Sequence, residues 1–76
     1  MEERGMNRER VESSSIASIG YDPGGQVLEV EFRNGSVFQY RSVPADTYEE
    51  FRRAPSVGRH FNKHIRPGNY SCFRVL

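Results

Sequence analysis

The feature that most constrains the fold of this chain is Asn34-Gly35, which lies between two stretches of alternating residues. Both residues of this dipeptide tolerate positive φ, which the tightest β-hairpin turns require. Residues 26–32 and 37–42 each alternate apolar with polar side chains. The apolar sides of the two stretches are formed by Leu28, Val30, Phe32, Phe38 and Tyr40. The pattern predicts a β-hairpin around which the remaining segments must pack.

A further strand is predicted over residues 15–21, before the turn Asp22-Pro23-Gly24-Gly25. A period of two places Ala17, Ile19 and Tyr21 on one face of this strand, with Ile16 on the other. By the same alternation, the acidic side chains of the next strand, Glu29 and Glu31, are expected to face water. Short connections between these three strands favour an antiparallel meander.

Two short helices are predicted after the meander. Pro44 can begin the first helix, in which an apolar stripe at i, i+3 and i+6 passes through Phe51. Ser56 is a candidate N-cap for the second helix, which Pro67-Gly68 ends. Residues 70–75 have the composition of a strand that can close the sheet. The expected fold class is α+β, in the order β-β-β-α-α-β, with a small antiparallel sheet and both helices packed on one face.

Seventy-six residues make one small domain. Residues 1–13 are charged and show no apolar period, so we expect a flexible N-terminal arm followed by a single domain over residues 14–76. Cys72 is the only cysteine, which excludes an internal disulfide. No segment has the pattern of a signal peptide or the length of a membrane span. These features predict a cytoplasmic location and no membrane contact.

Charge is separated along the chain. No acidic residue follows Glu50, so residues 51–76 carry +6 while residues 1–50 carry −5, which sums to +1. A cationic end can attract a polyanion at long range even when the net charge is small. We therefore expect contacts to nucleic-acid phosphates. The candidate contact residues are Arg52, Arg53, Arg59, His60, Lys63, His64, Arg66 and Arg74.

The basic residues admit a second interpretation. Arg59, Lys63 and Arg66 are spaced by four and three, so they share one face if the second helix is regular through that stretch. Alternatively the helices present only a solvated charged surface, with the two arginines at the end of the first helix paired to Glu49 and Glu50. The sequence leaves both interpretations open.

Aromatic residues could also contribute to binding. Phe38 and Tyr40 can stack on unpaired bases, as in sheet-based RNA modules. Because they share a face with the apolar side of the preceding strand, a core role is the favoured interpretation, which leaves Tyr40 as a candidate stacking or rim residue. Gly58 would allow a close approach by backbone or ligand, and packing against the first helix is the favoured explanation.

No catalytic residue, metal site or cofactor is predicted. His60 and His64 lie at i, i+4 and could share a metal with Cys72. However, the Glu of the zinc-protease pattern is missing, and the neighbouring cations would repel a metal ion. A lone cysteine in a closing strand is expected to be a small core residue. No segment combines an activated nucleophile, a base and a pocket-forming loop, so an enzyme is not expected.

Taken in order, these features resemble a known family. The resemblance depends on Leu28-x-Val30-x-Phe32, Gly35, Phe38-x-Tyr40, Val43-Pro44, Ala54-x-Ser56-x-Gly58, Phe61-Asn62 and Ile65-Arg66. Residues 14–74 resemble the KTSC domain, a short module named for its place at the C-terminus of some lysyl-tRNA synthetases. The chain departs from the family's central Tyr-x-Tyr, which is Phe38-Gln39-Tyr40 here. The resemblance implies RNA binding by association with a tRNA-handling enzyme, and it brings no catalytic residues.

The expected function is therefore a small nucleic-acid-binding module, for RNA rather than DNA. Phosphate contacts position a ligand without reading its sequence, so weak sequence specificity is expected. The alternative is a protein-interaction module that acts through its basic helix or through a sheet edge. A monomer or a weak homodimer is expected.

Overall fold

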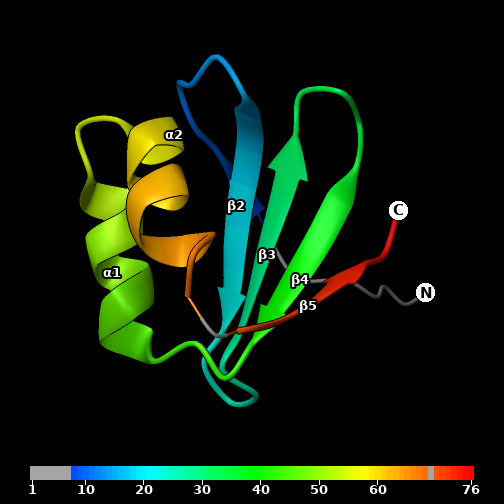
Figure 1. Cartoon of the computed structure of the whole chain (residues 1–76), viewed down its shortest axis with the longest axis vertical. Helices are drawn as coiled ribbons and strands as arrows, with labels where there is room; N and C mark the ends of the chain where they lie inside the picture. The colour runs from blue at the N-terminus through cyan, green and yellow to red at the C-terminus, as the bar shows by residue number, and fades with distance from the viewer. Residues whose placement is uncertain (1–7, 69) are drawn as a thin grey trace.

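The computed structural model describes residues 8–68 and 70–76. Within this part of the chain, a five-stranded antiparallel sheet in the order β1-β2-β3-β4-β5 carries its helices on one side (Figure 1). The strands are β1 (Arg8–Arg10), β2 (Ile16–Asp22), β3 (Val27–Phe32), β4 (Val37–Arg41) and β5 (Ser71–Arg74). The helical segments are α1 (Ala45–Arg53), α2 (Val57–His60) and the π-helical turn η1 (Phe61–Ile65). The predicted α+β fold, with its meander, two helices and closing strand, is confirmed.

The central hairpin forms where Asn34-Gly35 predicts it, but its turn is not the tight type in which both residues have positive φ, because Asn34 does not. Gly35 N–H donates to the Phe32 carbonyl and Phe32 N–H donates to the Ser36 carbonyl, so the loop spans residues 33–35. Leu28 lies opposite Tyr40 and Val30 lies opposite Phe38 in the β3–β4 register, so these side chains share the face beneath the helices. Gly35 has a φ of +94°, which a residue with a side chain adopts only with strain. The turn residue and the two strand patterns therefore act together to set this register.

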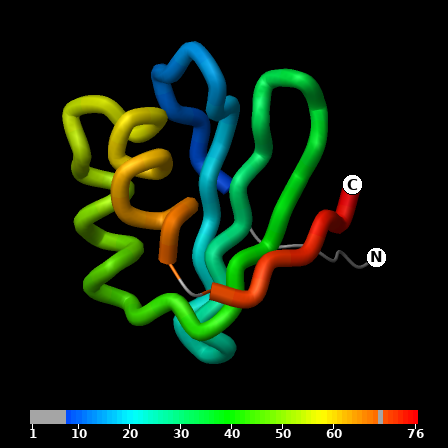
Figure 2. The backbone as a smooth tube through the Cα atoms, in the orientation of Figure 1, coloured from blue at the N-terminus to red at the C-terminus, as the bar shows by residue number. Residues whose placement is uncertain are grey.

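The boundary predicted for the N-terminal arm is wrong at its inner end. Arg8–Arg10 form β1, which pairs antiparallel with β2, and Val11 N–H donates to the Ala17 carbonyl just beyond it. This edge strand is held by backbone hydrogen bonds and by an ion pair from Arg8 to Glu29. It does not depend on burial, and so its sequence shows no apolar period. Figure 2 shows this blue segment and the red β5 at separate ends of the sheet. Residues 1–7 of the predicted arm lie outside the described residues.

A β-bulge changes the predicted faces of β2. Ile16 lies opposite Phe32, whereas Ser18 lies opposite Glu31, so β2 holds one residue more than β3 over this step. The extra residue breaks the period of two. Ile16, which was predicted on the opposite face from Ile19, is therefore fully buried together with it.

The core lies between the helices and the sheet. Its fully buried members, each at or below 2% exposure, include Ile16, Ile19, Leu28, Val30, Val43, Phe51 and Ile65. The predicted burial of Phe51 in the apolar stripe of α1 is confirmed. Tyr48 of the same helix stacks on Tyr21 of β2, with ring centroids 4.7 Å apart. α1 is thus anchored to the sheet at its first turns and at its middle.

The sheet face away from the helices is polar but not uniformly exposed. Glu29 is only 4% exposed, so the prediction that it faces water is wrong. Arg8 from β1 lies against its carboxylate, and Gln39 Nε2 donates to the same group at 2.9 Å. The neighbouring strands thus cover an acidic side chain that the alternation alone would leave in solvent. Across residues 8–68 and 70–76, no helix has the length and apolarity needed to cross a membrane.

Candidate nucleic-acid interface

The segment that carries most of the candidate cations is a short helix of mixed type. As predicted, Ser56 caps its start, because its hydroxyl oxygen accepts a hydrogen bond from Arg59 N–H. The regular turn then widens at Phe61, and Arg66 N–H donates to the Phe61 carbonyl at 2.8 Å, an i→i+5 bond. A π-helical turn changes the angular spacing of the side chains that it carries. The second helix is therefore not regular, and a regular helix was the condition under which Arg59, Lys63 and Arg66 would share one face.

The widened turn separates the three cations of this segment. Arg59 and Lys63 line one shallow hollow. Arg66 instead lines a recess against the sheet, and its guanidinium donates to Asn62 Oδ1 at 3.3 Å. All three side chains are exposed, and no carboxylate of the described residues forms an ion pair with any of them. We refer to Arg59, Lys63 and Arg66 as the α2–η1 cations.

The two arginines at the end of α1 have carboxylate partners. Arg52 lies 3.2 Å from Glu9 on β1 and 3.5 Å from Glu49, and Arg53 lies 3.6 Å from Glu49. The hydrogen bond that Arg52 donates to Glu9, followed by the charges of Glu9 and Glu49, raises the pKa of Arg52. This pairing agrees with the alternative interpretation, except that Glu9 is the second carboxylate partner instead of the expected Glu50.

The two histidines lie beside Arg59 and Lys63. Together with Ala54 and Pro55 these side chains line a hollow of about 230 Å³, which we call the histidine hollow. The rings of His60 and His64 have centroids 4.5 Å apart, and His60 also lies on the Phe51 ring at 5.8 Å. Burial, and then the charge of His64, lowers the pKa of His60, against an opposing effect of Glu50. His60 therefore adds positive charge only at a pH below the usual range for histidine.

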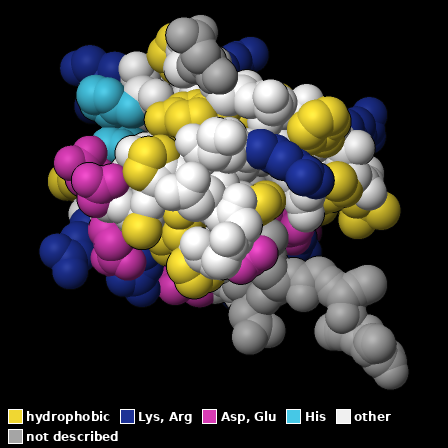
Figure 3. Space-filling view, turned by 90° about the horizontal axis from the view of Figure 1, so that it is seen from below, with side chains coloured by type: hydrophobic (Ala, Val, Ile, Leu, Met, Phe, Trp, Pro, Cys, Tyr) yellow, Lys and Arg dark blue, Asp and Glu magenta, His cyan; other side chains and the backbone are white. Residues whose placement is uncertain are grey.

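The remaining candidate, Arg74, lies on β5. It is directly opposite Phe38 in the β4–β5 register, and its Nε donates to the Leu76 carbonyl at 3.1 Å. The predicted cations thus fall into separate groups on α1, on α2–η1 and on β5. In the space-filling view from below, Lys and Arg side chains are scattered over this face and its outline, while the histidines lie together (Figure 3).

A recess of about 470 Å³ opens between the β3–β4 hairpin and η1. Four aromatic rings line it, those of Phe32, Phe38, Tyr40 and Phe61. The polar side chains around them are Ser15, Asn34, Ser36, Asn62 and Arg66. We call this cavity the aromatic recess. The helices lie toward the β2 side of the sheet (Figure 1), which leaves Phe38 on β4 only half buried.

The rings of the aromatic recess hold one another edge-to-face. Phe32 lies 5.9 Å from Phe38 and 5.4 Å from Phe61, and Tyr40 lies 5.7 Å from Phe61, with interplanar angles of 73–79°. Tyr40 is 9% exposed, so it belongs to the core while also lining the recess. Burial, followed by the neighbouring Cys72 thiol, raises the pKa of its hydroxyl. Tyr40 is thus a neutral, fixed part of the wall.

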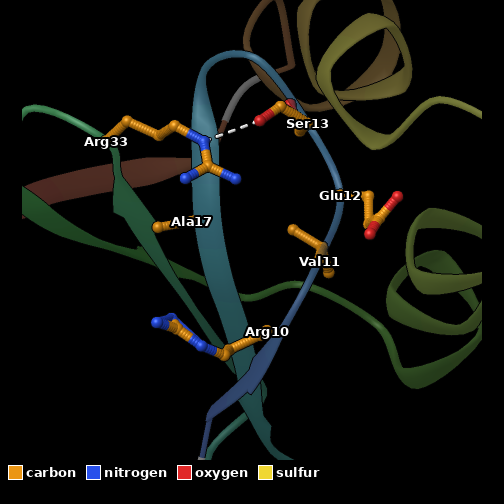
Figure 4. Close-up of a pocket in the computed structure, with 6 residues that line it drawn as sticks. All are labelled: Arg10, Val11, Glu12, Ser13, Ala17 and Arg33. Atoms are coloured by element: carbon orange, nitrogen blue, oxygen red, sulfur yellow. Dashed lines mark hydrogen bonds between the residues drawn. The ribbon is translucent and has the colours of Figure 1, made fainter.

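A second hollow, of about 590 Å³, lies beside the bulge of β2 (Figure 4). Arg10 and Arg33 flank Ala17 there, and Arg33 Nε donates to the Ser13 carbonyl at 2.7 Å. Glu12 also lines this hollow, so its charge is mixed. Neither arginine was among the predicted contact residues, because the sequence placed Arg10 in the arm and Arg33 at a turn.

Two expectations for single residues are corrected by the structure. A Cβ on Gly58 would meet Ser13 Oγ at 2.9 Å and Ser15 Oγ at 3.2 Å, so the close approach is to the segment before β2 and not to α1. Cys72 is exposed, because β5 is an edge strand whose four residues are all exposed. Over the described part of the chain, no three or more His, Cys, Asp or Glu residues cluster as a metal site.

Comparison with known proteins identifies the family. The model of the KTSC domain matches residues 12–70. This chain belongs to the KTSC domain family. A KTSC domain protein from Yersinia pestis, known from its crystal structure, has 41% sequence identity and a TM-score of 0.87, covering 95% of this chain and 100% of its own. An uncharacterized protein of Stutzerimonas stutzeri is 43% identical over 70 residues, which are 92% of this chain and 99% of that protein.

Another KTSC relative is much longer than this chain. A lysine–tRNA ligase of Nostoc punctiforme is 44% identical over 55 residues, which are 72% of this chain and 10% of the ligase. Many residues through which the sequence resembles the KTSC domain line the aromatic recess. They are Phe32, Phe38, Tyr40, Phe61, Asn62 and Arg66. These family motifs were the one signal in the sequence that pointed to the recess. The sequence analysis did not predict that their residues line one cavity.

Proposed function

We propose that this KTSC domain binds single-stranded nucleic acid, RNA in preference to DNA, through its phosphates. The observation that carries the proposal is the set of α2–η1 cations. Arg59, Lys63 and Arg66 are exposed on one short helical segment, and no described carboxylate pairs with them. Unpaired cations neutralise phosphates and release counterions, which gives affinity that falls as salt rises.

The other candidate residues contribute unequally to this proposal. Arg74 on β5 extends the contact surface beyond the aromatic recess, and His60, beside His64, adds charge in acid. Arg52 and Arg53 contribute less, because a carboxylate already offsets each of them. A phosphate would have to displace these carboxylates before it could pair with either arginine. The proposal thus ranks the eight residues by their expected contribution to phosphate binding, whereas the sequence analysis did not distinguish among them.

The relatives add support by association. A matching segment forms one tenth of a protein named as a lysine–tRNA ligase. We extend this association to the present chain as part of the proposal, together with a cytoplasmic location. A binding role is proposed rather than catalysis, because Ser56, which lines the histidine hollow, has its hydroxyl engaged as the cap of α2.

Fluorescence anisotropy with a labelled single-stranded RNA at two or more salt concentrations tests the proposal. The variant R59A/K63A/R66A removes the α2–η1 cations, and R52A/R53A is a control with a comparable loss of charge from the paired arginines. Each phosphate contact on a single strand contributes about 0.7 to the slope of log affinity against log salt. We expect the triple variant to lose about 2 from this slope and the control to lose less than 1. Absence of wild-type binding at low salt would refute the proposal.

A second candidate function is supported by the free edge of β5. The outer strand carries large exposed apolar side chains in and just after it, with Phe73 at 51%, Val75 at 48% and Leu76 at 73% exposure. An exposed strand edge of this kind can add a strand from another protein or from a second copy. Sedimentation at increasing protein concentration tests this alternative. RNA affinity that survives R59A/K63A/R66A, together with self-association lost in F73S, would favour it.

A further inference from the structure

The aromatic recess has a chemical character that phosphate binding does not use. Its walls combine four aromatic rings with the side-chain amides of two asparagines and one guanidinium. Its volume of about 470 Å³ lies within the range of small-molecule sites. A cavity needed only for packing would be filled by side chains, because protein interiors are close-packed. The half-buried rings of Phe32 and Phe38 instead leave aromatic surface at an opening.

The two asparagines of the recess are oriented by their neighbours. Asn34 Oδ1 accepts hydrogen bonds from Ser36 N–H at 3.0 Å and from Ser36 Oγ at 2.6 Å. Asn62 Oδ1 accepts from the Arg66 guanidinium at 3.3 Å. In each amide the oxygen is engaged, and the amino group has no partner among the described residues. Each side chain therefore holds a pair of donor hydrogens available to a ligand.

The cation at the recess is positioned beside these donors. Arg66 lines the cavity and is tied to Asn62, while Arg74 lies opposite Phe38 on the adjoining strand. A ligand in the recess would thus present a flat aromatic body to the rings, acceptor atoms to the amides, and an anion to the guanidinium. A nucleotide unit of a single strand combines these three properties, whereas an aliphatic or proline-rich peptide carries no anion beside its apolar group.

We propose that the aromatic recess holds one unstacked nucleobase of a single strand, with the adjoining phosphate at Arg66. This inference rests on the proposed function and specifies how its ligand is held. Phe38 and Phe32 supply the stacking surface, Asn34 and Asn62 donate to the base edge, and the α2–η1 cations follow the backbone. Because the rings already hold one another edge-to-face, binding requires little rearrangement.

A comparison of two strands of equal charge tests the inference. The first is an eight-residue oligouridine, and the second is the same strand with every base removed, so that only ribose and phosphate are present. Stacking on an aromatic side chain favours a bound base by about 5- to 150-fold. We expect oligouridine to bind more tightly than the abasic strand by a factor in this range. In NMR spectra, oligouridine should also shift the side-chain amide signals of Asn34, which the abasic strand should leave in place.

Two variants assign the difference to the recess. F38A and N62A should each reduce the preference for bases toward unity, measured as the ratio of the two affinities within the same variant. R59A/K63A should weaken both strands by the same factor. N62A alters an exposed side chain, so it keeps the test decisive if F38A fails to fold. Equal affinity for the two strands, with salt dependence intact, would overturn the recess inference and leave the proposed function standing. Failure of both strands to bind at low salt would overturn both.

Discussion

Replacement of Gly58 by alanine tests how α2 is seated against the segment before β2. Taken alone, alanine is favoured over glycine in a helix by about 1 kcal/mol, and by less in a first turn. The new Cβ would lie 2.9 Å from Ser13 Oγ, which must then move. That oxygen accepts hydrogen bonds from Ser15 N–H and Ile16 N–H, each at 3.2 Å. Two such bonds contribute about 1–3 kcal/mol together.

The two effects oppose each other, and the loss of the hydrogen bonds is the larger. We expect G58A to lower the free energy of unfolding by about 0.5–2 kcal/mol. For a domain of this size, 1 kcal/mol corresponds to a shift in Tm of about 4–8 °C. Urea denaturation and thermal melting both measure the change. The loss of stability should be greatest at β2 and its bulge, because the displaced Ser13 hydroxyl accepts hydrogen bonds from the backbone at the start of that strand.

A double-mutant cycle with Ser13 separates the contact from helix propensity. S13A removes the oxygen that the new methyl group would meet, so G58A in the S13A background should be neutral or stabilising. The coupling energy between the two sites should therefore be at least 0.5 kcal/mol, as is typical of residues in contact. Strict additivity of the two changes, or stabilisation of the otherwise unchanged protein by G58A, would refute this account of the glycine.

Three further predictions concern other parts of the domain. R8A leaves Glu29 buried without its cation, so we expect the free energy of unfolding measured with urea to fall by about 1–3 kcal/mol. An unchanged urea midpoint would contradict this. NMR titration should give His60 a midpoint below 6.5, and H64Q should raise it by removing a like charge. Because the unfolded chain binds that proton at a higher pH than the folded one, stability should fall as pH drops below 6.5; a midpoint above 6.5 would reverse this sign. Cys72 should react with a thiol reagent in the native protein, and protection until denaturation would show that β5 is covered.

The parts of the fold that local chemistry determines were predictable from the sequence. Gly35 marks the loop of the hairpin, and the flanking alternation sets which side chains face the helices. Ser56 caps α2 by accepting a hydrogen bond from Arg59 N–H. Each of these features depends on residues a few positions apart. The α+β class and the order of the later elements follow from them.

The features that the sequence did not predict depend on partners far along the chain. β1 has no apolar pattern and forms because β2 offers an open edge and Glu29 offers a charge to Arg8. The bulge that turns Ile16 into the core is fixed by the β2–β3 register, which no local period reveals. The β2 segment was predicted correctly as a strand, and residues 1–13 were recognised as polar. In both segments, however, pairing with a distant strand decided the final structure.

The sequence suggested candidate contact residues but not how they are arranged. The sequence singled out the cations after Glu50 and placed Arg59, Lys63 and Arg66 together on the assumption of a regular helix. The π-helical turn directs Arg66 toward the sheet instead, beside aromatic rings from two strands. The recess brings together three segments, from residue 15, from the hairpin and from η1, and spacing along a chain does not predict such convergence.

The most direct test of the account is an NMR map of single-stranded RNA binding. We predict that backbone and side-chain signals of residues 59–66, together with those of Phe38, shift in proportion to added RNA at low salt and return toward their free positions as salt is added. Signals near the paired arginines Arg52 and Arg53 should move much less. Shifts confined to the end of α1, or spectra that remain unchanged at low salt, would contradict the claim that the α2–η1 cations and the aromatic recess form the binding surface.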